Sequence, residues 1–139
     1  MNQKRYMLSW AAATIVLLVT GWLWHVGMFS ESYAVWLKPV EKLKKSAMLV
    51  IIAEICRGGT LAYIYPLVFR GGKPWSEGIR FGLMMGFFTG LVIAIIYAQV
   101  NFKSISWLFA EFAFVLLQGM IVGTVIAYLF GKHVEQLPE

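Results

Sequence analysis

The chain places a few ionisable side chains and one glutamine deep inside long apolar stretches. Glu54 and Arg57 belong to the sequence AEICRGG, while His25, Glu111 and Gln118 lie in other apolar stretches. A charge at the centre of a bilayer costs about 2.5 to 3.5 kcal/mol on insertion scales, so such residues usually face a protein interior and pair with one another. These residues are therefore the first candidates for a functional site.

The depths of these residues in the membrane give a second reason to group them. A helix rises about 1.5 Å per residue, so Glu54 lies about one turn before Arg57 on the same helix face. By this count Arg57 lies near the middle of its stretch, and His25 and Glu111 lie about 10 Å from the midplane, on the side of Glu54. Tyr97 belongs to the same side, nearer the surface. The sequence therefore predicts a polar cluster shared by several helices.

Two kinds of chemistry suit such a cluster. In the first, it is an internal network that fixes the helix register: Glu54 pairs with Arg57, and Gln118 is a neutral partner for Arg57. Glu111 then shares Arg57, bonds to His25 or is protonated. In the second, Arg57 anchors an anionic or carbonyl-bearing lipid-soluble molecule, such as a quinone, a lipid head group or a carboxylate. The sequence leaves both alternatives open.

Metal binding and catalysis have less support from the sequence. His25, Glu54 and Glu111 are suitable ligands for zinc, iron or manganese, but Arg57 would repel a cation, so we predict no metal site. The chain has no Gly-x-Ser-x-Gly elbow, phosphate-binding loop, paired-His zinc motif or haem-attachment Cys pair, and it contains no Asp. We therefore expect no enzymatic activity and no cofactor, apart from a lipid or quinone bound at the polar cluster.

Four membrane spans are needed to position these residues. The chain has 139 residues, 60% of them hydrophobic and 14% charged, and its mean hydropathy is +0.72. A helix of about 20 residues crosses a hydrocarbon core of about 30 Å, so four spans use the whole length. The predicted fold is an all-α integral membrane protein, an antiparallel four-transmembrane-helix bundle in one domain. Its expected spans within residues 1–139 are about 7–28, 47–69, 78–100 and 105–130.

The connections between the spans differ in length. The segment FSESYAVWLKPVEKLKKS, after the first span, suits either a short helix in the head-group layer or a solvated basic loop. The segment RGGKPWSE predicts a tight turn, in which Pro74 fixes the entry to the third span and Ser76 caps it. Only NFKS separates the last two spans, so neighbouring helices are expected to pack antiparallel.

Small residues recur every fourth position in the last two spans, as stripes of glycine. Such stripes let helix backbones approach closely, which supplies packing contacts that the hydrophobic effect cannot supply in lipid. They either close the bundle or dock another protein chain. The helix-packing residues predicted in this way are Gly78, Gly82, Gly86 and Gly90 in the third span and Gly119 and Gly123 in the fourth.

Aromatic and basic residues mark the predicted membrane interfaces. Trp10 and Trp24 lie toward opposite ends of the first span, where indole rings favour the interface. The net charge of +5 comes mainly from basic residues at the ends of apolar stretches, which meet lipid head groups, so nucleic-acid binding is not expected. Six basic residues lie on the side of the termini and five on the other, which favours cytoplasmic termini.

Three local features suggest a family. The first span ends in Gly21-Trp-Leu-Trp24, the third opens with Glu77-Gly78 followed by Gly82 and Gly86, and the last contains Gly119-x-x-x-Gly123. In these features and in its layout the chain resembles a family of small, four-span bacterial membrane proteins of unknown function. His25 stands where that family would have an aromatic residue such as tyrosine, and Glu54 and Arg57 do not carry over from it. The resemblance implies the four-span fold and no particular activity.

Two functions agree with these observations. The first expectation is a small accessory or scaffold subunit of a larger membrane protein complex, which packs against other subunits through its glycine stripes and aromatic faces. The alternative is a module that binds or transports a small lipophilic ligand at the cluster of His25, Glu54, Arg57 and Glu111. The expected partners, which are other membrane protein subunits in the first case and a lipophilic ligand in the second, both lie in the lipid bilayer.

Overall fold

The computed structural model describes residues 3–28, 46–99 and 105–131, and these residues are helical except for the turn at 69–73. The elements are α1 (Gln3–Trp22), a π-helix η1 (Leu23–Met28) that continues α1, α3 (Ser46–Val68), α4 (Pro74–Gln99) and α5 (Ile105–Gly131). Four helices are long and apolar enough to cross a membrane. The predicted all-α, multi-pass membrane fold is therefore confirmed. The candidate spans are Gln3–Met28, Met48–Val68, Pro74–Ile96 and Ile105–Phe130.

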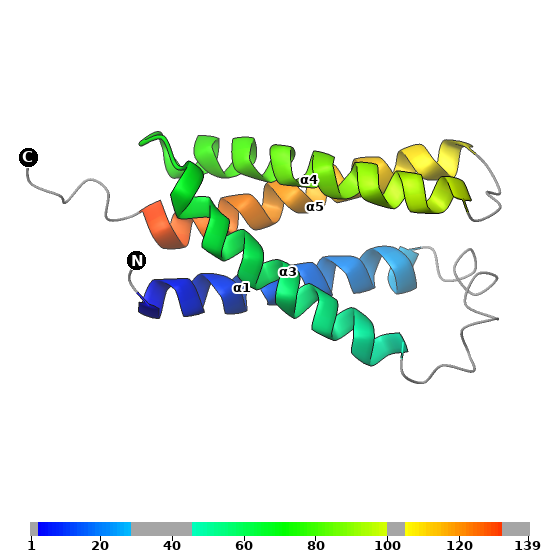
Figure 1. Ribbon diagram of the computed structural model, residues 1–139, viewed down its shortest axis with the longest axis horizontal. Helices are drawn as coiled ribbons and strands as arrows, with labels where there is room; N and C mark the ends of the chain where they lie inside the picture. The colour runs from blue at the N-terminus through cyan, green and yellow to red at the C-terminus, as the bar shows by residue number, and fades with distance from the viewer. Residues whose placement is uncertain (1–2, 29–45, 100–104, 132–139) are drawn as a thin grey trace, which may run out of the picture.

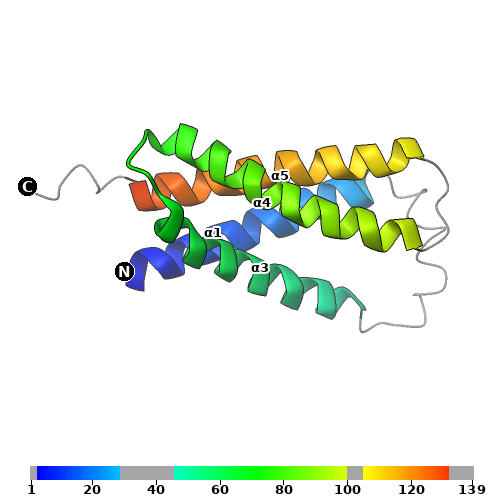
Figure 2. The ribbon, with the colours of Figure 1, turned by 45° about the horizontal axis from the view of Figure 1, so that its top comes forward.

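The helices alternate in direction, so the start of α1 and the end of α5 lie at the same end of the molecule (Figure 1; Figure 2). The α4 and α5 helices form the most extensive pair, and α1 packs against both α5 and α3. By contrast, α3 rests mainly on α1 and has only limited contact with α4 and α5. The bundle thus consists of a tight α4–α5 pair and an α1–α3 pair, and α1 joins the two pairs by packing against α5.

The turn between α3 and α4 differs from the sequence-based expectation. The α4 helix begins at Pro74 rather than at residue 78, and the backbone N–H of Glu77 donates to the carbonyl of Lys73 at 3.0 Å. Proline suits the first helical position because its missing N–H would have no partner there. Ser76 therefore lies inside the helix and is not its cap. Gly71 has a φ of 84°, a left-handed conformation that favours glycine.

The segment between the first two spans lies outside the described residues.

The glycine stripes of α4 and α5 face each other. A Cβ added to Gly78 would lie 2.5 Å from the Cα of Thr124, and one added to Gly86 would lie 3.0 Å from the carbonyl oxygen of Val115. The tightest approach is between Gly82 and Gly119, where an added Cβ on either residue would overlap the backbone of the other. The two stripes therefore close the bundle, and neither presents a free surface to another chain.

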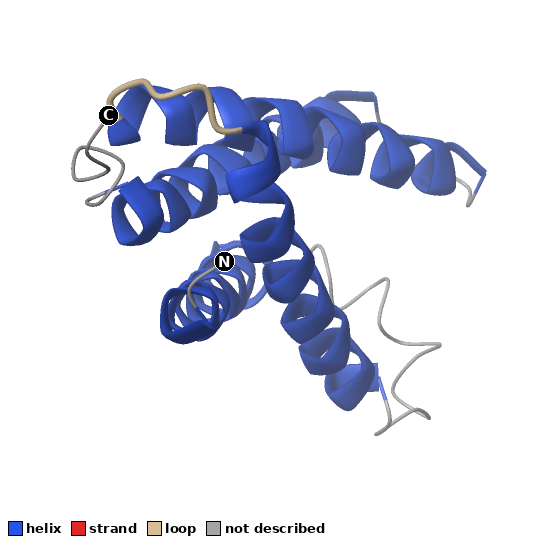
Figure 3. Ribbon diagram, turned by 60° about the vertical axis from the view of Figure 1, so that its left-hand side comes forward, coloured by secondary structure: helices blue, strands red, loops and turns tan. Residues whose placement is uncertain are grey.

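The buried core lies in the half of the bundle next to the α3–α4 turn. Its members come from every helix: Ala13, Leu17, Leu61, Tyr65, Phe81, Val122, Ile126 and Ala127. In the other half α3 diverges from the α4–α5 pair, and all of residues 48–53 are exposed (Figure 3). Met48 is 66% exposed and Ile52 is 44% exposed, whereas Ala62 is fully buried. The α3 helix is therefore packed into the bundle on one side of Arg57 and exposed on the other.

Candidate functional site

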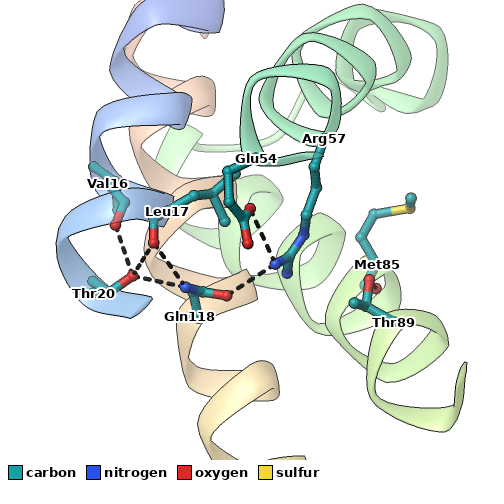
Figure 4. Close-up of polar contacts among 8 residues, drawn as sticks. All are labelled: Val16, Leu17, Thr20, Glu54, Arg57, Met85, Thr89 and Gln118. Carbon is teal, nitrogen blue, oxygen red and sulfur yellow. Dashed lines mark hydrogen bonds and ion pairs between the residues drawn. The ribbon is translucent and has the colours of Figure 1, made fainter. Parts of the chain in front are cut away.

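Arg57 forms the centre of a polar network between α1, α3 and α5 (Figure 4). Its Nη1 donates to Oε1 of Gln118 on α5 at 3.1 Å. The amide nitrogen of Gln118 donates in turn to the Leu17 carbonyl at 3.2 Å and to the Thr20 hydroxyl at 2.8 Å, both on α1. Since Gln118 is only 3% exposed, these bonds satisfy a polar group that would otherwise be costly to bury.

Glu54 supplies the countercharge to Arg57. Its Oε2 lies 3.5 Å from Nη1 of Arg57, one turn away on the same helix, and both side chains are 22% exposed. The pair is therefore partly exposed on the surface of α3. Both contacts of the guanidinium use Nη1, while Nε is buried with no hydrogen-bond partner among the described residues. The network thus leaves hydrogen-bonding capacity of Arg57 unused.

The side of Arg57 away from Gln118 faces α4. Figure 4 shows the guanidinium between Gln118 on one side and Met85 and Thr89 of α4 on the other. The Thr89 hydroxyl donates to the Met85 carbonyl at 2.8 Å, within its own helix. No hydrogen bond between described residues joins Arg57 to α4, so the guanidinium links α3 to α5 and leaves the α4 side unconnected.

The two glycines that follow Arg57 seat α3 on α1. A Cβ on Gly58 would lie 2.5 Å from the Thr14 hydroxyl oxygen, and one on Gly59 would lie 3.1 Å from the indole of Trp10. The Trp10 indole N–H donates to the Ile55 carbonyl at 2.7 Å. The sequence AEICRGG therefore combines a polar pair with a close helix contact, and that contact holds Arg57 at a fixed distance from α1.

A second cluster lies on α5 and the π-helix η1. Glu111 is 2% exposed; its Oε1 accepts a hydrogen bond from Trp24 Nε1 at 3.1 Å and lies 3.8 Å from His25 Nδ1. Trp24 also stacks on Phe114, with ring centroids 4.6 Å apart and ring planes 6° apart. Single π-helical turns are frequent at functional sites. Here the turn brings the adjacent residues Trp24 and His25 to one carboxylate.

A third group of polar residues secures the α3–α4 turn. Glu77 is 9% exposed and pairs with Arg80 at 2.5 Å, while its Oε2 also accepts from the backbone N–H of Arg70 at 3.3 Å. Arg80 donates to the Val68 carbonyl at 3.2 Å, at the last residue of α3. These contacts satisfy backbone groups near the helix ends and hold the turn closed. The group is therefore structural and separate from the Arg57 network.

The structure brings together some of the predicted site residues and separates others. Glu54, Arg57 and Gln118 form one cluster, and His25 and Glu111 form another. No hydrogen bond or ion pair between described residues joins Arg57 to Glu111, so these residues form two clusters where equal depth predicted one. The same residues contain no group of three side chains that could hold a metal ion. Tyr97 lies in the last turns of α4, and its side chain is outside the described part.

Sequence patterns missed several residues of these sites. Thr20 has a hydroxyl that accepts from Gln118, and the neutral side chain gives no charge signal within an apolar span. Trp10 and Trp24 looked like interface residues, but both indoles donate to groups on other helices. Their place in the membrane belts stays a prediction, and the structure adds that both indoles link helices. Glu111 was the signal that could have indicated the role of Trp24, because a carboxylate deep in an apolar span needs a buried hydrogen-bond donor on a neighbouring helix.

Replacing Glu111 tests whether the second cluster is held by a hydrogen bond. We expect Glu111→Leu to destabilise the protein by about 1 to 3 kcal/mol, because it removes the buried carboxylate that accepts the hydrogen bond of the Trp24 indole N–H. Glu111→Gln is expected to lose less than half as much, since its amide oxygen can still accept. Unfolding by SDS in mixed micelles, followed by circular dichroism, measures both. Equal stability of Glu111→Leu and wild type would contradict the prediction.

Comparison of the chain with protein-family models, with curated proteins and with solved structures gives no match.

Proposed function

We propose that this protein binds a lipid-soluble molecule in the membrane, with Arg57 as the anchor for its polar end. The observation that carries the proposal is the change in burial along α3 at Arg57. Gly58, Gly59, Leu61 and Ala62 beyond it are buried, whereas residues 48–53 before it are exposed on every face of the helix. A ligand that enters from the bilayer between the diverging helices would meet Arg57 where they converge.

The donors of Arg57 that make no hydrogen bond would give the proposed ligand its attachment point once the side chains that cover the buried Nε move aside. The guanidinium has five N–H donors in a rigid planar fork, and the Nε and Nη2 groups on one edge match a pair of acceptor oxygens. Gln118 and Glu54 contact Nη1 and leave Nε without a partner. A hydrogen bond made there is not in competition with bulk water, so one well-placed acceptor suffices to orient a hydrophobic molecule.

The retention of a ligand by purified protein tests this proposal. We expect native mass spectrometry after gentle detergent extraction to detect a lipophilic molecule on the wild type that is absent from Arg57→Lys. Lysine preserves the charge opposite Glu54 but lacks the planar fork. Arg70→Met is the matched control, because Arg70 is exposed in the α3–α4 turn and away from the network. Wild type without a ligand, or one that persists in Arg57→Lys, would contradict the proposal.

A second candidate function is the accessory subunit expected from the sequence. The glycine stripes are used within the bundle, so the surface available for docking is the exposed half of α3, with Met48, Leu49 and Val50 each more than half exposed. In a membrane, this apolar surface contacts either lipid or another protein chain. Co-purification of the same membrane protein with wild type, and its loss when Leu49 is replaced by Trp, would favour this function over ligand binding.

We further propose that the protein lies in a bacterial inner membrane with its termini in the cytoplasm. Lys4, Arg5, Arg70 and Lys73 lie at the end of the molecule that holds the start of α1 and the α3–α4 turn. Positive residues concentrate on the cytoplasmic side of membrane proteins. A reporter that is active only in the periplasm is expected to stay inactive at the C-terminus, and activity there would reverse the orientation.

A further inference from the structure

We infer that the ligand of Arg57 carries a neutral carbonyl group, such as an ester, a ketone or a quinone, and that Glu54 excludes carboxylates from the site. This inference rests on the proposed function and deepens it, because it assigns the chemical class of the ligand and a residue that determines specificity. It follows from the charges that surround the unused donors of Arg57.

The charge of Arg57 is already balanced by Glu54. The carboxylate oxygen of Glu54 lies 3.5 Å from Nη1, and the other polar neighbour, Gln118, is neutral. A neutral acceptor on the free edge of the guanidinium leaves the balance unchanged. A carboxylate would add a second negative charge within the membrane and near Glu54, where like charges repel and uncompensated charge is costly.

Among the described residues, no second cation contacts Arg57 to offset this second charge. Its polar neighbours there are Glu54 and Gln118, and neither is basic. Arg80 is engaged in the separate group at the α3–α4 turn, where it binds Glu77 and the Val68 carbonyl. The hydroxyls of Thr20 and Thr89 are neutral and already donate to backbone carbonyls in their own helices. The site therefore offers donors without net positive charge.

Two photoreactive probes with the same diazirine-bearing acyl chain test the inference. One ends in a methyl ester and the other in the free carboxylate, and both are added in alkaline buffer to protein in zwitterionic nanodiscs. We expect labelling of α3 and α4 by the ester to exceed labelling by the carboxylate by about tenfold, which corresponds to a modest difference in binding energy. Mass spectrometry of the labelled peptides gives the ratio.

Glu54→Gln is the deciding variant. Its amide oxygen keeps a polar atom beside Nη1, but the negative charge is gone, so carboxylate labelling should rise to at least the level of the ester. Arg57→Lys should reduce ester labelling and Arg70→Met should not. A wild type that prefers the carboxylate, or an unchanged ratio in folded Glu54→Gln, overturns the inference while leaving the proposed function intact. If Glu54→Gln does not fold, the wild-type ratio decides alone.

A different outcome would remove the proposed function itself. If neither probe labels α3 or α4 more strongly in wild type than in Arg57→Lys, Arg57 is not an anchor for lipid-soluble acceptors. The inference about the ligand class then fails with the proposal on which it rests.

Discussion

Replacing Gly82 by leucine is expected to separate α4 from α5 and to destabilise the protein by at least about 3 kcal/mol, the upper end of the usual cost of overpacking. At this position an added Cβ would overlap the backbone of Gly119 and Met120. Backbone atoms in a helix cannot rotate away as a side chain can, so the helices themselves must move. SDS unfolding followed by circular dichroism, with size-exclusion chromatography as a check for aggregation, measures the loss.

The neighbouring glycines provide graded controls for this prediction. An alanine at Gly86 would meet the Val115 carbonyl at 3.0 Å, and one at Gly90 would meet only the ring of Phe112, which can move. The loss of stability should therefore fall in the order Gly82→Ala, Gly86→Ala, Gly90→Ala. Gly27→Leu is the matched control, since the nearest atom to its Cβ is 4.0 Å away, on Leu23. A Gly82→Leu variant as stable as Gly27→Leu would rule out the α4–α5 contact.

The contact between α4 and α5 could be predicted from the sequence because its signal is periodic. Glycines at every fourth position lie on one face of a helix, and two such stripes on consecutive antiparallel spans have a strong reason to meet. Gly58 and Gly59 perform the same task between α3 and α1, but they are adjacent and do not form a stripe. Their role depends on Thr14 and Trp10, which lie on another helix, so the sequence of α3 alone could not reveal it.

The candidate site was only partly predictable for a similar reason. Helix periodicity correctly paired Glu54 with Arg57. Membrane depth follows from the rise of a helix, and it left both Gln118 and Glu111 open as partners of Arg57, of which the structure has Gln118. Depth does not give the rotation of one helix relative to another. The π-helix at Leu23–Met28 changes that rotation at the end of the first span and turns Trp24 and His25 toward Glu111. The divergence of α3 depends on tertiary packing in the same way.

Replacing Arg57 by methionine is the second change with a large expected effect. It leaves the Glu54 carboxylate in the membrane without a cation and removes the hydrogen bond to Gln118. Breaking a fully buried pair costs about 3 to 5 kcal/mol, and because Glu54 is 22% exposed we expect a smaller loss, about 2 to 3 kcal/mol. The same SDS unfolding assay measures it, with Arg70→Met as the control that removes an exposed arginine.

The double variant Glu54→Gln and Arg57→Met separates the structural role of the pair from its role in binding. Without either charge no uncompensated ion remains, so the double variant should be more stable than Arg57→Met alone, with a coupling energy of at least about 1 kcal/mol. Additive losses would mean that the two charges do not stabilise each other in the folded protein. If stability returns but the ester probe no longer labels α3 and α4, the guanidinium serves a ligand. If labelling returns as well, Arg57 only fixes the helices, because a methionine has no donor with which to hold a carbonyl group.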